Sequence, residues 1–257
     1  MRTQDLKKEL EHFKRNDWYR LESQDQLDQD SIAHYVQDLI SRTNLGEGDN
    51  VLEIACGGGQ FSVELIKKSG IEYTGLDLMA QLVADAKRRA YKEKIKATYL
   101  QGDAHRLPFK ENSFDLVIVT YSLHHFPPES LNQVTAEVFR VLKKGGLYYV
   151  LEPNGLNPIM FKWWLQNSPE RLLPLGKRWR ETRDLSANET IIYPWNITKS
   201  LKTKFSSVKV FGLGFIPKNQ PFFKQRKNFW SKIEKVIEKT PVLNKFGGSF
   251  IVLGKKT

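Results

Sequence analysis

Five short apolar runs alternate with amphipathic segments between residues 50 and 152, and this alternation limits the possible folds more than any other feature of the chain. The runs are NVLEIA, EYTGLDL, ATYLQGD, FDLVIVTYS and GLYYVLE. Their nearly continuous apolar character is typical of strands buried on both faces of a parallel sheet. The segments FSVELIKKSG, MAQLVADAKRRAYKEK and PESLNQVTAEVFRVLKKGG have the spacing and end signals of helices. The pattern predicts an α/β fold with a doubly wound, mostly parallel sheet.

The segments on either side complete the predicted architecture of one domain over residues 1–257. Helical spacing predicts two packing or lid helices within residues 1–45, one with Leu6, Leu10 and Phe13 and one with Ile32, Val36, Leu39 and Ile40. A core over 46–152 is followed by an insertion over 153–206, which we expect to cover the substrate. Residues 207–257 contain two late strands, VKVFGLGF and GSFIVLGKK, separated by a helix near NFWSKIEKVIEK. We expect the last strand to be antiparallel and inserted beside the strand before it.

Composition excludes several classes of protein. The only cysteine, Cys56, excludes an internal disulfide and any zinc cluster built from cysteines, and we predict no metal site. The sequence has neither a signal-peptide start nor an apolar stretch of membrane-spanning length, so we expect a soluble cytoplasmic protein.

The charge is unevenly distributed along the chain. Residues 155–257 have 20 Lys and Arg against 6 Asp and Glu, whereas residues 1–154 have a net charge of −3. Five of the six tryptophans also lie in the basic part. This combination favours an anionic or amphipathic partner, and the alternative is a solvated basic face over an ordinary core.

Three consecutive glycines follow the first apolar run directly, in VLEIACGGGQ. A strand, a glycine turn and a helix in succession place backbone N–H groups and a helix N-terminus against a ligand. The dinucleotide-binding pattern G-x-G-x-x-G is met imperfectly from Gly57, because Ser62 stands where its third glycine would be. Asp77 ends the second run 18 residues after Gly59, where a carboxylate can accept both hydroxyls of a ribose.

Further motifs end the later runs, namely QGDAHRLPF, FDLVIVTYSLHHFP and VLKKGGLYYVLEPN. Over residues 48–154 the chain resembles the class I S-adenosylmethionine-dependent methyltransferases of the small-molecule type, similar to methyltransferase domain 11. Residues 53–59 resemble the family's acid-x-G-x-G-x-G motif, with Ala55 in place of the first glycine. The resemblance implies a Rossmann-like, seven-stranded sheet and S-adenosylmethionine as the cofactor.

The resemblance also implies cofactor contacts. Glu53 would lie near the methionine amino group, Asp77 would bind the ribose, and Asp103 would accept a hydrogen bond from the adenine amino group. The implied set is Glu53, Ala55, Gly57, Gly59, Asp77, Leu78, Asp103, Ala104 and Tyr121. The residues agree with a cationic sulfonium ligand, because no Lys or Arg lies in the glycine turn to hold a phosphate.

Three residues are candidates for catalysis. His124 and His125 follow the fourth run, and in similar small-molecule methyltransferases the first histidine of such a pair is often the proposed general base. Glu152, at the end of the fifth run, would lie opposite it. A histidine whose pKa is near neutrality suits the removal of a hydroxyl proton. Alternatively, the histidines only shape the pocket or cap the next helix, and Glu152 binds a substrate group or holds its loop.

The acceptor is open from the sequence. The motif TYSLHH lacks the Asn/Asp-Pro-Pro-aromatic signature of enzymes that methylate exocyclic amines of bases. The segments PIMFKWWL and RLLPLGKRW mix large apolar side chains with basic ones, which favours an amphipathic acceptor: a lipid, a quinone precursor or a substrate on an acidic carrier protein. Such an acceptor is also compatible with a location at the periphery of a membrane. We favour O-methylation and leave N- and C-methylation open.

Three other functions stay open as alternatives. One is an RNA methyltransferase that uses the basic C-terminal part, although no separate RNA-binding module is visible. Another is a non-catalytic, methyltransferase-like binding module. The third is a nicotinamide-dependent oxidoreductase, which Ser62 at the third glycine position disfavours. The sequence gives no indication of the oligomeric state.

Overall fold

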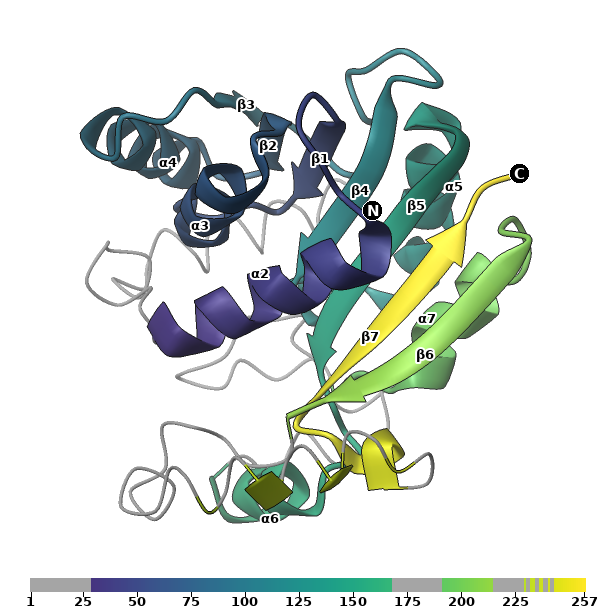
Figure 1. Cartoon of the computed structure of the whole chain (residues 1–257). Coiled ribbons are helices and arrows are strands. Elements are labelled where there is room, and N and C mark those ends of the chain that lie inside the picture. The colour runs from purple at the N-terminus through teal and green to yellow at the C-terminus, as the bar shows by residue number, and fades with distance from the viewer. Residues whose placement is uncertain are drawn as a thin grey trace.

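A seven-stranded sheet forms the centre of the structure (Figure 1). The computed structural model describes residues 29–167, 191–214 and 243–257, with residues 229, 232, 233, 236, 237 and 240. The strand order is β3-β2-β1-β4-β5-β7-β6. The strands are β1 (Asn50–Ile54), β2 (Glu72–Asp77), β3 (Thr98–Gln101), β4 (Phe114–Thr120), β5 (Leu142–Pro153), β6 (Ser207–Leu213) and β7 (Ser249–Lys255).

Strand directions agree with the prediction from the apolar runs. The pairs among β1 to β5 are parallel. Strand β7 is antiparallel to both of its neighbours, β5 and β6, and lies between them. The predicted doubly wound, mostly parallel sheet with an antiparallel last strand is therefore confirmed, and the two late strands belong to the same sheet as the first five.

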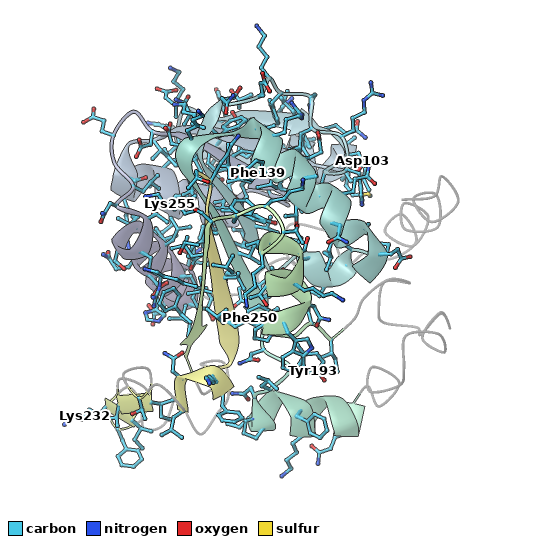
Figure 2. The ribbon with its side chains drawn as sticks, turned by 90° about the vertical axis from the view of Figure 1, so that its right-hand side faces the viewer. Asp103, Phe139, Tyr193, Lys232, Phe250 and Lys255 are labelled. Atoms are coloured by element: carbon cyan, nitrogen blue, oxygen red, sulfur yellow. The ribbon has the colours of Figure 1, made fainter. Side chains whose placement is uncertain are left out.

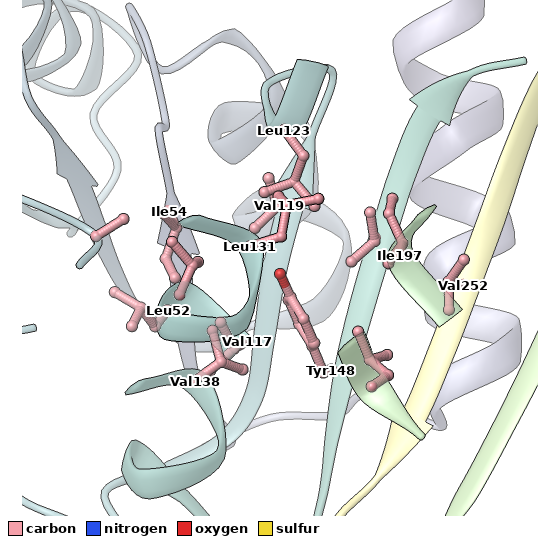
Figure 3. Packing of buried hydrophobic residues seen from close by; sticks show 14 of the residues in the cluster. Leu52, Ile54, Val117, Val119, Leu123, Leu131, Val138, Tyr148, Ile197 and Val252 are labelled. Atoms are coloured by element: carbon pink, nitrogen blue, oxygen red, sulfur yellow. The ribbon is translucent and has the colours of Figure 1, made fainter. Parts of the chain in front are cut away.

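Helices cover both faces of this sheet. The buried apolar residues of α2 (Gln29–Thr43), α3 (Gln60–Ser69) and α4 (Ala80–Lys92) belong to the core on one face. The core on the other face is formed with α5 (Leu131–Val141) and α7 (Pro194–Leu201) (Figure 3). Phe250 of β7 belongs to this second core and lies beside α7 (Figure 2). A further helix, α6 (Pro158–Asn167), lies beyond the carboxyl end of β5.

The side chains of β1 alternate between the two faces of the sheet, so this strand contributes to the cores on both faces. Leu52 and Ile54 pack in the core with α5, while Val51 packs in the core with α2 and α3. Successive side chains of a strand point to opposite faces, so a strand covered on both sides must be apolar at nearly every position. The one charged exception in this strand is Glu53, which is 1% exposed.

Two boundaries differ from the sequence prediction. Helix α5 ends at Val141 rather than at the glycines of KKGG, because Leu142 takes an extended backbone (φ −67°, ψ 140°) and begins β5. The Lys256 ammonium binds the carbonyls of Phe139 and Leu142, and thereby holds the end of the helix.

The predicted insertion also contains α7, which has Pro194 in its first turn and buries Ile197 and Leu201. Helix α7 therefore packs on the sheet as a regular crossover helix would.

Some predictions fall on residues outside those described. These are the helix of Leu6, Leu10 and Phe13, the segment RLLPLGKRW, and most of NFWSKIEKVIEK. Within the described ranges, no helix has the length and hydrophobicity required to cross a membrane. The same residues contain no cluster of three or more His, Cys, Asp or Glu that could hold a metal ion.

We expect Lys256→Met to destabilise the fold by about 2 kcal/mol, or roughly 4–8 °C in melting temperature. Lys256 is 8% exposed, and its ammonium binds two main-chain carbonyls and the side-chain oxygen of Asn112. Methionine fills a similar volume but leaves these acceptors unpaired. The exposed neighbour Lys255 is the matched control, and Lys255→Met should change the urea midpoint little. Equal losses in both variants would contradict the capping role.

Candidate cofactor and active site

A pocket of about 200 Å³ lies where β1, β2, β3 and β4 end at the carboxyl edge of the sheet. Four segments line it, one after each strand: Ile54, Ala55 and Gly57; Leu76, Asp77, Leu78, Met79 and Leu82; Gly102, Asp103, Ala104 and His105; and Tyr121, Ser122, His125, Phe126 and Pro127. None of these lining residues is Lys or Arg. In open α/β sheets, ligands bind at this edge, so the topology and the chemistry of the wall identify the candidate site.

The glycine turn has the backbone that the sequence pattern requires. Gly57 and Gly59 have φ angles of 54° and 76°, in the left-handed region that favours glycine. A Cβ on Gly59 would lie 3.1 Å from the Ala86 Cβ, whereas a Cβ on Gly57 would meet no atom within 4 Å. The turn is held from behind, because the Arg89 side chain donates to the Gly58 carbonyl at 2.9 Å. Gly59 thus permits close packing on α4, and Gly57 leaves space at the pocket.

Asp77 connects the turn after β1 with the start of α4. Its Oδ2 accepts a hydrogen bond from the Gly57 N–H, and its Oδ1 accepts one from the Met79 N–H, both at 2.9 Å. Burial raises the pKa of Asp77 to about 6, although these N–H donors favour the ionised form. The carboxylate lines the pocket at the position expected for the ribose contact.

Glu53 lies behind the pocket wall and is absent from its lining. Both oxygens are bonded inside the protein: Tyr73 donates to Oε2, and Thr120 donates to Oε1 at 2.9 Å. Burial raises the pKa of Glu53 to about 7. Its contact with the methionine amino group stays a prediction of the resemblance.

The loop after β3 contains Asp103, Ala104 and His105, all of which line the pocket. Asp103 Oδ1 accepts hydrogen bonds from the His105 N–H at 2.9 Å and from the His105 ring at Nδ1, 2.6 Å away. The His105 hydrogen bonds hold the pKa of Asp103 below its usual value. Beside this pair the wall is apolar, with Leu78, Ala104 and Phe126, and can enclose a flat heterocycle.

Tyr121 follows β4 and has φ 50°, a left-handed conformation that is uncommon for a side chain of this size. Its hydroxyl is hydrogen-bonded to the Ser249 Oγ at 2.6 Å, and its ring centroid lies 5.7 Å from that of Tyr35 in α2. Burial raises the pKa of Tyr121 well above its usual value, so the phenol stays neutral. Tyr121 therefore gives the pocket an aromatic wall fixed from two sides.

His124 and Glu152 are brought together as the sequence predicted. The His124 Nδ1 lies 2.8 Å from the Glu152 Oε2, while Glu152 Oε1 accepts from the N–H groups of Ser122 and Leu123 at 2.9 and 2.6 Å. The Glu152 side chain is fully buried, whereas that of His124 is 14% exposed. The His125 ring lies 4.2 Å from the His124 ring and lines the pocket, which His124 does not.

The sequence did not predict several residues of the pocket wall, among them Met79, His105, Ser122 and Phe126. They lie in short loops, where hydrophobic periodicity gives no signal. One local signal was present, because an aspartate often accepts the N–H two residues later, as Asp103 does from His105. This turn chemistry could have identified His105.

Comparison with known proteins identifies the type of domain in the middle of the chain. Residues 51–146 match the family model described as methyltransferase domain. An uncharacterized methyltransferase of Synechocystis sp. is 39% identical over 108 residues, which is 42% of this chain and 49% of that protein. A sterol 24-C-methyltransferase of Gibberella zeae is 36% identical over 48% of this chain and 32% of its own. A 2-phytyl-1,4-naphtoquinone methyltransferase of Synechocystis sp. is 31% identical over 56% of this chain and 62% of its own.

Solved structures share the fold over most of the chain. A protein of Pyrococcus horikoshii has a TM-score of 0.64 at 19% identity and covers 96% of this chain and 99% of its own. A geranyl diphosphate methyltransferase in complex with S-adenosylmethionine has a TM-score of 0.57 at 17% identity, over 88% and 85% of the two chains. Residues 51–146 thus form a methyltransferase domain that resembles the class I S-adenosylmethionine-dependent methyltransferases, and the chain spans between 32% and 62% of the length of these three relatives. The predicted fold is confirmed, and the match of residues 51–146 supports the predicted methyltransferase class with S-adenosylmethionine as its cofactor.

The two glycines of the turn should respond differently to alanine. We expect Gly57→Ala to reduce stability by about 1 kcal/mol, from backbone strain alone. In Gly59→Ala, the new Cβ would also clash with Ala86 and with the Tyr99 hydroxyl, which is hydrogen-bonded to Ser62. We therefore expect the free energy of unfolding to fall by more than roughly 2 kcal/mol. Urea unfolding of the ligand-free protein measures both. Equal losses would mean that packing under Gly59 is unimportant.

Cofactor affinity should depend on pH through Asp77. With a pKa of about 6 in the free protein, only the ionised carboxylate accepts two ribose hydroxyls fully, so affinity should fall as pH decreases below 6. We expect S-adenosylhomocysteine to bind about tenfold more weakly at pH 5 than at pH 7. Asp77→Asn should bind weakly at both values, and calorimetric titration measures this. The control is Glu93→Gln at an exposed position, and it should show the same dependence of affinity on pH as the parent protein. If the affinity of the parent protein did not change with pH, the ribose contact of Asp77 would be contradicted.

Proposed function

We propose that this chain methylates a small amphipathic acceptor that carries a hydroxyl group, and that the methyl group goes to the hydroxyl oxygen. The observation that carries the proposal is the His124–Glu152 pair, which adjoins a pocket lined by acids and apolar side chains. Methyl transfer from a sulfonium requires an aligned nucleophile, and a hydroxyl also needs a base. An amine or an activated carbon can attack the methyl group with little help from a base, so such an acceptor would depend less on the His124–Glu152 pair.

The pocket wall supports the placement of the cofactor. Asp103 and the Ala104 N–H would bind the adenine, and Asp77 would bind the ribose, with Leu78 against the base. The methionine end would lie along Ala55, Gly57 and Tyr121, toward the loop of His125. Gly59 and Glu53 support this surface from behind, Gly59 through close packing and Glu53 through its bonds to Tyr73 and Thr120.

The chemistry follows from the buried carboxylate. Glu152 already accepts two main-chain N–H groups through Oε1, so its Oε2 accepts the Nδ1–H of His124. This tautomer makes Nε2 the basic nitrogen of His124. In the proposed step Nε2 takes the hydroxyl proton, the oxygen bonds to the methyl carbon, and the bond from that carbon to sulfur breaks. The products are the methyl ether and S-adenosylhomocysteine, with the proton on His124.

A second candidate is C-methylation of an isoprenoid-bearing acceptor such as a quinol. The names of two relatives favour it, a 2-phytyl-1,4-naphtoquinone methyltransferase and a sterol 24-C-methyltransferase. In a quinol the same base would generate the phenolate, whose ring carbon then attacks the methyl group. The predicted insertion over residues 153–206 would cover such an acceptor. The exposed Phe161 of α6 is compatible with this role.

We expect His124→Asn to lower turnover by about a hundredfold or more, with cofactor affinity within threefold of the parent. The parent rate should rise with pH through the histidine pKa, and this limb should be lost in the variant. Activity is measured with isotopically labelled methyl groups on phenol, quinol and lipid acceptors. Near-normal turnover with an unchanged pH profile would contradict the base, although the methyltransferase class would stand.

Glu152→Gln tests the tautomer with little change in shape. A glutamine oxygen still accepts from Ser122 and Leu123, but its NH₂ group would face Nδ1 and place the proton on Nε2. We expect a loss of turnover comparable to that of His124→Asn, because the wrong tautomer removes the base. Analysis of the product by NMR separates an O–CH₃ from a C–CH₃ group. Formation of C–CH₃ alone would replace the first candidate by the second.

A further inference from the structure

His105 contains a buried nitrogen that the proposed chemistry leaves unused. The residue is 7% exposed and lines the pocket between Asp103 and Phe126. Among the described residues, its Nε2 is the one buried side-chain nitrogen or oxygen that has no hydrogen-bond partner. A buried polar atom without a partner is unfavourable by about 1–3 kcal/mol, so its presence in a pocket wall suggests a missing ligand.

The tautomer of His105 follows from Asp103. The pKa of Asp103 lies below its usual value, so its Oδ1 is ionised and accepts the proton of His105 Nδ1 across 2.6 Å. In a neutral imidazole with the proton on Nδ1, Nε2 is an acceptor. The group that completes the site must therefore donate an N–H or O–H.

The backbone of the loop that contains His105 is held by side chains of α5. Gln133 donates to the His105 carbonyl at 3.0 Å, and Glu137 accepts the Leu107 N–H at 2.8 Å. Arg140 donates to the carbonyls of Leu107 and Phe109 at 3.0 and 2.7 Å. The Phe126 ring, 5.7 Å from that of His105, bounds the imidazole on another side. The loop backbone and the Nδ1 side of the ring are thus held in the absence of a ligand.

We propose that His105 is a binding residue for the purine of the cofactor, and that its Nε2 accepts one hydrogen of the exocyclic 6-amino group. Asp103 Oδ1 is occupied by His105, and the Asp103 side chain is 37% exposed, which leaves Oδ2 for the other hydrogen. Two fixed acceptors then select a base with an amino group over one without it. This inference rests on the placement of the adenine given under the proposed function.

Two substitutions separate the roles of the two ring nitrogens. His105→Asn retains a donor near the position of Nδ1 and loses the distal acceptor, whereas His105→Gln retains a polar atom near the position of Nε2. The ligands are S-adenosylhomocysteine and its analogue with an unsubstituted purine, which lacks the 6-amino group. Calorimetric titration needs no methyl acceptor, so the result is independent of the acceptor chemistry. Gln133→Ala is the control for the loop.

We expect the parent protein to prefer S-adenosylhomocysteine to the purine analogue by tenfold or more. His105→Asn should weaken S-adenosylhomocysteine about tenfold and leave the analogue unchanged, while His105→Gln retains part of the preference. Equal weakening of both ligands, or parent-like affinities in His105→Asn, would overturn the proposal and leave His105 as a brace for Asp103. If the parent bound neither ligand, the cofactor placement itself would fail.

A measurement without substitution covers the case in which the variants do not fold. With ¹⁵N-labelled histidine, the Nε2 resonance of His105 reports whether this nitrogen accepts a hydrogen bond. It should shift on addition of S-adenosylhomocysteine to the parent protein and stay in place with the purine analogue. An identical response to both ligands would contradict a bond to the 6-amino group.

Discussion

Three carboxylates buried at the carboxyl edge of the sheet determine how the site is built. Glu53, Asp77 and Glu152 lie within the last two residues of the strands β1, β2 and β5, and their exposed fractions are 1%, 6% and 0%. A buried carboxylate is tolerated only when its oxygens are hydrogen-bonded. Here the donors are main-chain N–H groups, hydroxyls and a histidine rather than Lys or Arg. No basic side chain is among these donors, and such an environment suits a cationic sulfonium ligand.

The same bonds join the loops that form the pocket. Asp77 connects the turn after β1 to the start of α4, and Glu152 connects the end of β5 to the loop after β4. Because the loops are already positioned, binding requires little further ordering of the chain. The raised pKa values of Asp77 and Glu53, about 6 and 7, are the consequence of this burial. A bound cation would favour their ionised forms and release protons.

Most of the sheet could be predicted because buried strands and amphipathic helices have strong periods in the sequence. The Asp77, Asp103 and His124–Glu152 positions followed from strand ends, since parallel strands bring their carboxyl ends to one edge. Glu53 was harder to place, because alternation along β1 sends it toward Tyr73 and Thr120. Helix α7 was missed because its short amphipathic run follows a segment without clear strands. His105 depends on a two-residue turn contact, which periodicity does not encode.

The acceptor lies beyond sequence prediction for a physical reason. The cofactor is constant across the class, so its contacts recur at fixed strand ends, and the family match ends at residue 146. Acceptors differ among the relatives by their names, and the segments that we propose to contact the acceptor, such as α6, lie after the matched residues. The two histidines after β4 stand between these regions. His124 is bonded to Glu152 of β5, while His125 lines the pocket, so this one loop connects the centre of the sheet with the pocket wall.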